Sequence, residues 1–75
     1  MYYVIKSKTG SVPDETVQFH ELDQRVTALA GRNPLAFHSV RRRLRERGVV
    51  YIATARGSVA REVYGQGFLV EKVDS

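Results

Sequence analysis

Residues 33–48 constrain the fold most, because they contain every signal expected of a single helix. Asn33 is a suitable N-cap, and Pro34 suits the first helical position, where its missing N–H costs no hydrogen bond. Gly48 can adopt the left-handed conformation that ends a helix. Apolar residues recur between these positions at helical spacing, namely Phe37, Val40 and Leu44. We therefore predict a helix over residues 34–47 with one buried stripe and a polar outer face.

The segment before this helix carries a second apolar stripe at helical spacing. The stripe consists of Phe19, Leu22, Val26 and Leu29. It predicts a helix over about residues 20–30, which ends at Gly31. Residues 16–19 stay ambiguous, because their two apolar residues also alternate as they would in a strand.

Residues rich in β-branched and aromatic side chains predict strands at both ends of the chain, over residues 2–8, 49–53 and 68–73. Residues 59–64 favour a returning strand, although their apolar residues also recur four apart as in a helix. Composition places turns at residues 9–14, 56–58 and 65–67. The order of elements predicts one α+β domain over residues 1–75.

Composition narrows the function. The 75 residues include no cysteine and only two histidines, so we expect no disulfide, no metal site and no cofactor. No apolar stretch approaches the roughly 18 residues that a membrane span needs, so we expect a cytoplasmic protein. A core this small leaves little room for a substrate cleft of several hundred cubic ångströms, so we expect the protein to have no enzymatic activity.

The positive charge is concentrated in one segment. The chain has a net charge of +4, and residues 41–47 alone carry five arginines against one glutamate. The planar guanidinium group matches phosphate or carboxylate oxygens in a bidentate fashion. A basic helix face of this kind is typical of nucleic-acid binding, and the alternative is a solvated face that keeps the protein soluble.

The stretch 26–44, VTALAGRNPLAFHSVRRRL, resembles the helix-turn-helix core of small phage and bacterial DNA-binding proteins. Residues 38–48 are similar to the recognition helices that enter the hairpin of winged-helix domains, and the resemblance extends over roughly residues 22–56. It implies a small winged-helix-like domain with an N-terminal strand, a two-helix core and a C-terminal β-hairpin. It also implies a non-catalytic regulator of transcription or DNA processing that binds double-stranded DNA.

The resemblance assigns a role to each polar residue of the second helix and the wing. That helix would enter the major groove, with Ser39 and Arg42 reading base edges. Arginines further along it would contact phosphates, and the turn at residues 56–58 would contact an adjacent part of the backbone. The predicted set is Asn33, His38, Ser39, Arg42, Arg43, Arg45, Arg47, Arg56 and Arg61.

Other partners stay open at this point. A small phage-type protein could instead bind a larger host enzyme by placing its basic face on an acidic protein surface, and A-form RNA is a third partner. A DNA reader of this size usually covers two half-sites as a homodimer. The four tyrosines fall in the expected strands, where they could stack on single-stranded nucleic acid or simply be half buried, namely Tyr2, Tyr3, Tyr51 and Tyr64.

Overall fold

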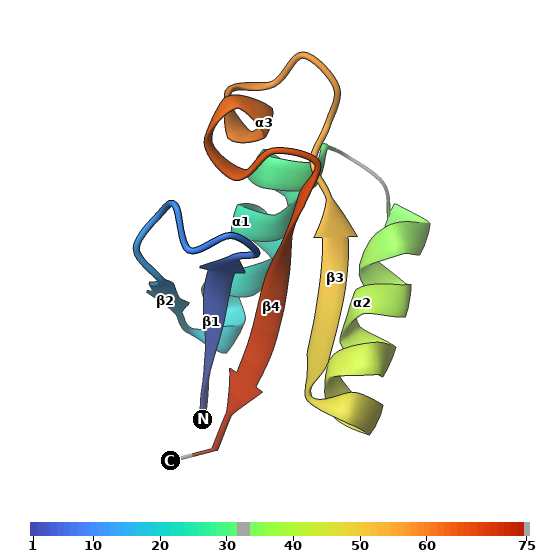
Figure 1. The fold of residues 1–75 in the computed structure, drawn as a ribbon. Helices are drawn as coiled ribbons and strands as arrows, with labels where there is room; N and C mark the ends of the chain where they lie inside the picture. Colours follow the sequence, from blue (N-terminus) through green and yellow to red (C-terminus); the bar gives the residue numbers. More distant parts are fainter. Residues whose placement is uncertain (32–33, 75) are drawn as a thin grey trace.

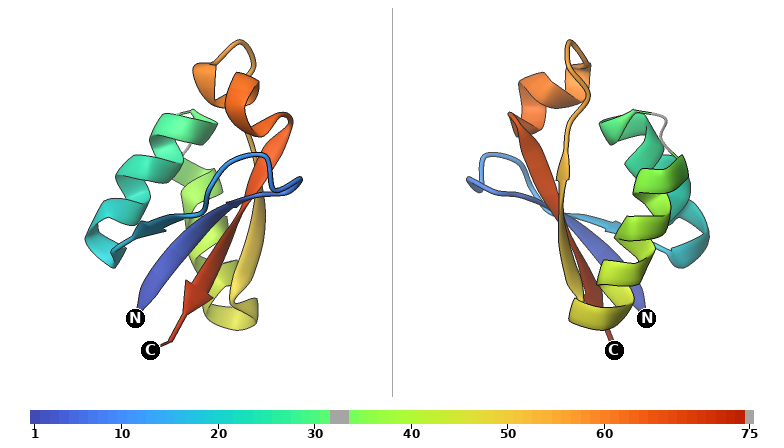
Figure 2. Two further views of the ribbon diagram at one scale, coloured as in Figure 1. Left: turned by 60° about the vertical axis from the view of Figure 1, so that its left-hand side comes forward. Right: turned by 90° about the vertical axis from the view of Figure 1, so that its right-hand side faces the viewer.

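Two long helices lie against one face of a four-stranded antiparallel sheet (Figures 1 and 2). A computed structural model describes residues 1–31 and 34–74, and among these the side chains of all but residues 34–36. The elements in chain order are β1 (Tyr2–Ser7), β2 (Glu15–Val17), α1 (Phe19–Ala30), α2 (Pro34–Arg47), β3 (Val49–Ala53), α3 (Val59–Tyr64) and β4 (Gly67–Val73). The predicted α+β class is confirmed.

The sheet has the strand order β2-β1-β4-β3, and every neighbouring pair is antiparallel. The first and last strands therefore pair at the centre, where Tyr2 lies opposite Val73 (Figure 1). Ile5 is paired with Val70, which is also paired with Val50 on the other side. Because residues paired in register project to the same face, these three side chains form one apolar surface that meets the helices.

The core fills the space between this sheet face and the helices. Ile5, Phe68 and Val70 are fully buried. The helices add Leu22, Val26 and Leu29 from α1 and Val40 and Leu44 from α2. Both predicted apolar stripes are confirmed, except that Phe19 at the start of the first stripe stays half exposed.

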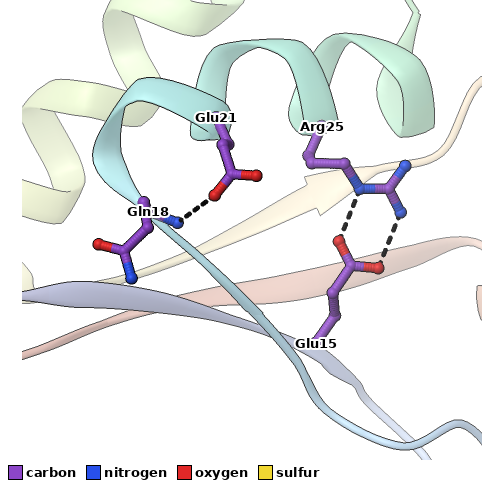
Figure 3. A network of polar contacts seen from close by, with 4 residues as sticks. All are labelled: Glu15, Gln18, Glu21 and Arg25. Atoms are coloured by element: carbon purple, nitrogen blue, oxygen red, sulfur yellow. Dashed lines mark hydrogen bonds and ion pairs between the residues drawn. The ribbon is translucent and has the colours of Figure 1, made fainter.

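Polar contacts fix the start of α1 beside β2 (Figure 3). The Gln18 backbone N–H donates to Glu21 Oε1 at 3.2 Å. The Arg25 guanidinium donates twice to the Glu15 carboxylate, with N–O distances of 2.6 and 2.9 Å. The helix ends at Gly31, whose φ of 87° lies in the region that favours glycine.

The bounds of α2 are those that the sequence predicts. The helix begins at Pro34, and the expected N-cap Asn33 lies outside the described residues. It is followed by Gly48, which has a φ of 79° and donates its N–H to the Leu44 carbonyl at 3.0 Å. The chain then enters β3 without an intervening loop.

Residues 16–19, which the sequence left open, divide between two elements. The strand β2 ends at Val17, and α1 begins at Phe19, slightly earlier than the sequence predicts. The apolar alternation therefore describes residues 16–17, which lie in β2, and the helical stripe describes Phe19, which lies in α1.

The returning strand over residues 59–64 is wrong, because these residues form the short helix α3. Ser58 caps it by accepting a hydrogen bond from the Arg61 N–H at 3.2 Å. Tyr64 therefore lies in a helix and not in a strand, with its ring tilted against Phe68. The C-terminal β-hairpin is corrected in the same way. β3 and β4 pair as expected, but residues 54–66 join them through α3 and not through a tight turn.

Within the described ranges, no helix combines the length and the apolar character that crossing a membrane requires.

Candidate nucleic-acid interface

The outer face of α2 carries the concentrated positive charge. Val40 and Leu44 are buried against the sheet, which turns the rest of the helix toward solvent. All five arginines of residues 41–47 are exposed, as are His38 and Ser39. Burial of the apolar stripe thus determines where the guanidinium groups point.

These arginines have no acidic partner among residues 1–31 and 34–74. The ion pairs there lie elsewhere, between Arg25 and Glu15 and between Lys6 and Glu71. Each α2 guanidinium therefore keeps its donors available to solvent or to an anionic partner. The result is an exposed basic surface, which we call the arginine face; it consists of Arg41, Arg42, Arg43, Arg45 and Arg47.

The structure brings only part of the predicted set together. His38, Ser39, Arg42, Arg43, Arg45 and Arg47 all lie on the exposed side of α2. Asn33 lies outside the described residues. Arg56 is exposed in the turn before α3, and Arg61 is half buried in α3. β3 begins directly after α2 and runs back beside that helix, so the turn that follows β3 lies toward the start of α2 and away from its end at Arg47 (Figure 1).

A groove opens between α1 and α2 at the end of the pair away from their connection. The two helices run in opposite directions and diverge toward that end (Figure 2). The groove has a volume of about 580 Å³. Its cationic or imidazole side chains are His38, Arg41, Arg42, Arg45 and Lys72, and its aromatic side chains are Tyr3 and Phe19. Among the residues that the structure describes, no acidic side chain lines it. We call it the α1–α2 groove.

Aromatic rings hold Arg41 in this groove. The Arg41 guanidinium carbon lies 4.9 Å from the centroid of the Phe19 ring and 5.7 Å from that of Phe37. The Phe19 ring in turn lies 6.3 Å from the Tyr3 ring. Such cation–π contacts reduce the freedom of a long side chain and place its charge in advance of binding.

A second hollow, of about 470 Å³, lies between α2, β3 and the C-terminal half of α1. Its lining includes Ser39 and Arg43 of α2, Val50 and Ile52 of β3, and Thr27 of α1. The two hollows correct the expectation that a core of this size leaves little room for a cleft of several hundred cubic ångströms. Both are open surface grooves that the sequence did not predict.

Three charged or aromatic residues of the α1–α2 groove were not expected in a site. Arg41 lay outside the predicted set, and Phe19 was expected only as part of the apolar stripe of the first helix. No sequence pattern indicates that Lys72 belongs to a site, because only the pairing of β4 with β1 and β3 brings it near α2. Comparison of the chain with known protein families, curated proteins and solved structures found no match.

Proposed function

We propose that the chain is a non-catalytic DNA-binding protein that contacts double-stranded DNA with its arginine face. The observation that carries the proposal is the exposure of all five arginines of α2 with no carboxylate partner among the described residues. Phosphate contacts supply most of the affinity in such complexes, and arginine forms them in a bidentate fashion.

The proposed roles follow the position of each side chain on α2. Ser39 and Arg42 read base edges in the major groove, and Arg43, Arg45 and Arg47 contact phosphates. A winged-helix-like arrangement remains part of the proposal, with α1 and α2 as the helix-turn-helix and the β3–β4 pair as the wing. Two features support it: the helices are consecutive, and the strands after them are antiparallel neighbours. A role in regulating transcription or DNA processing follows from this proposal.

The second candidate function is binding to a larger protein, and the free edge of β3 favours it. The backbone N–H groups of Lys72 and Thr54 donate to the carbonyls of Gly48 and Gln66, so even-numbered positions of β3 bond toward β4. The odd-numbered positions 49, 51 and 53 therefore point their backbone groups away from the sheet. An extended segment of another protein could pair there and fill the second hollow.

Salt-dependent binding to a short blunt duplex tests the main proposal. With about four phosphate contacts, affinity should fall roughly 150-fold between about 50 and 200 mM salt, since each contact adds about −0.9 to the logarithmic slope. The Arg43→Ala, Arg45→Ala double variant should flatten that slope by about 1.8.

The matched control is the Lys6→Ala, Lys8→Ala double variant, which removes two positive charges from β1 and the turn after it. It should keep the wild-type slope within about 0.5, because neither side chain belongs to α2. No binding at about 50 mM salt, or an unchanged slope in the arginine variant, contradicts the proposal.

A further inference from the structure

The α1–α2 groove presents two kinds of surface side by side. On one side, Arg41, Arg42 and Arg45 of α2 and Lys72 of β4 supply positive charge, and none of the described residues that line the groove is acidic. On the other side, Phe19 supplies exposed aromatic surface, and the buried Tyr3 ring lies 6.3 Å from it. A ligand that uses the whole groove therefore needs an anionic group attached to a flat, apolar one.

Phe19 is the unusual member of this set. It stands at the start of α1, and 51% of its surface is exposed, although it continues the apolar stripe that buries Leu22. The Arg41 guanidinium lies over its ring in a cation–π contact. Nucleic-acid bases stack on aromatic rings and also on guanidinium planes, so this pair offers a preformed stacking surface.

We propose that the α1–α2 groove binds one unpaired nucleotide, with its phosphate on Arg45 and Lys72 and its base stacked on Phe19 and Arg41. The volume of about 580 Å³ lies within the range of small-molecule sites. The nucleotide comes either from the single-stranded end of a nucleic acid or from free nucleotide in solution, because both present the same phosphate and base.

The aromatic wall separates this proposal from simpler ligands. Inorganic phosphate would use the cations and leave Phe19 uncovered. A base inside a duplex is stacked between its neighbours, so its face cannot stack on the Phe19 ring unless the base leaves the duplex stack. If the nucleotide is the end of a nucleic acid, the inference rests on the proposed DNA binding and adds a preference for DNA with an unpaired end.

The first experiment compares three DNA ligands by fluorescence anisotropy at one salt concentration. The first ligand is a blunt duplex, the second is the same duplex with a short 5′-phosphorylated overhang, and the third carries an abasic overhang of equal length. The abasic overhang keeps the phosphates and removes the bases. We expect the base-bearing overhang to bind roughly 5- to 150-fold more tightly than the abasic one, the range expected for one stacked base.

Two single variants test the assignment. Phe19→Ala should reduce the advantage of the base-bearing overhang to less than about twofold and leave blunt-duplex affinity unchanged. Lys72→Gln should weaken both overhang ligands and spare the blunt duplex, and its control is Lys8→Gln, which removes one charge away from the groove. Lys72 is a β4 side chain outside the helical core, so this variant keeps the test valid even if Phe19→Ala fails to fold.

The second experiment tests the free source. Titration of a nucleoside monophosphate should shift the backbone amide NMR signals of α1 and β4 residues beside the groove, and inorganic phosphate at equal concentration should shift them less. Such shifts without any effect of an overhang identify free nucleotide as the ligand.

Loss of blunt-duplex binding alone overturns the proposed function but not this inference, which the mononucleotide titration still decides. Equal affinity for base-bearing and abasic overhangs, together with mononucleotide shifts no larger than those from phosphate, overturns the inference. Saturable binding of an acidic peptide in the groove with no response to any nucleotide also overturns it.

Discussion

The two long helices use their charged residues in opposite ways. In α1, the Arg25 guanidinium makes a bidentate pair with Glu15 of β2, and Glu21 accepts a hydrogen bond from the Gln18 N–H (Figure 3). In α2, the arginine face points outward, and its members have no carboxylate partner among the described residues. The first set of charges joins elements of the fold, and the second set faces solvent.

This contrast separates charges that hold the structure from charges that are available for binding. The hydrogen bond with Glu15 is the main reason that the pKa of Arg25 is raised above its ordinary value. Removing such a charge should cost stability. Removing the charge of Arg42, Arg43, Arg45 or Arg47 from the arginine face should change what the protein binds and leave its stability nearly unchanged.

The largest expected effect is on stability, and it appears when a buried residue of α2 and its exposed neighbour are each changed to alanine. Leu44→Ala should lower the free energy of unfolding by about 2–5 kcal/mol, because Leu44 is 3% exposed and its truncation leaves a cavity. Arg45→Ala should change stability by less than about 0.5 kcal/mol and weaken duplex binding. Urea denaturation and anisotropy measure the two effects. A destabilisation by Arg45→Ala comparable with that of Leu44→Ala would refute the assignment of the arginine face to binding.

The next effect concerns the pair that joins β2 to α1. Arg25→Ala should lower the free energy of unfolding by about 1 kcal/mol or less, because the geometry is bidentate but both side chains are more than a third exposed. Most of the loss should disappear at high salt. Duplex affinity should stay unchanged. A double-mutant cycle with Glu15→Ala isolates the pair, and a coupling energy near zero would show that this contact is as dispensable as an ordinary surface pair.

Local signals explain why the sequence predicts α2 so well. Its start at Pro34, its apolar stripe and its end before Gly48 are each encoded within a few residues. Residues 59–64 lack such a set of agreeing signals. Their two exposed valines are typical of a strand, and only Ala60 is buried. Ser58 was the available signal, since a serine directly before the segment is a preferred helix N-cap.

The candidate site likewise has one part that the local sequence predicts and one part that it does not. The arginine face follows from the stripe that opposes it, so the sequence predicts the exposure of Arg42 and Arg45. The α1–α2 groove depends on how α1, α2 and β4 are arranged in space, and no local pattern joins Phe19 to Lys72. The same dependence applies to Arg56, because only the path of β3 back along α2 determines how far the turn at residues 56–58 lies from Arg47 (Figure 1).

A smaller effect is expected at the start of α1. Glu21→Ala should lower the free energy of unfolding by about 0.5 kcal/mol, because the Gln18 N–H loses its acceptor and the helix N-terminus loses a negative charge. Glu21→Gln is the control, since its amide oxygen can still accept the hydrogen bond. If both variants lose stability equally, the charge matters and the hydrogen bond does not.

The smallest effect depends on pH and arises at Tyr64. Burial, followed by the nearby Glu15 carboxylate, raises the pKa of Tyr64 above its ordinary value of 10.0. Below about pH 10 the phenol is protonated in both states and contributes nothing to pH dependence. Above that pH the unfolded chain loses its proton first, so the free energy of unfolding falls as pH rises toward the raised pKa of the folded state.

Tyr64→Phe should therefore be relatively more stable at about pH 10.5 than at about pH 8, compared with the wild type at each pH. Adding Glu15→Gln to both proteins should narrow that difference, because the carboxylate charge no longer opposes ionisation of the phenol. Paired urea denaturations at the two pH values measure it. A constant difference between Tyr64→Phe and the wild type would mean that Tyr64 ionises as easily in the fold as in the unfolded chain. Because burial is the first cause of the raised pKa, such a result would contradict the burial of the phenol as well as the influence of the Glu15 carboxylate.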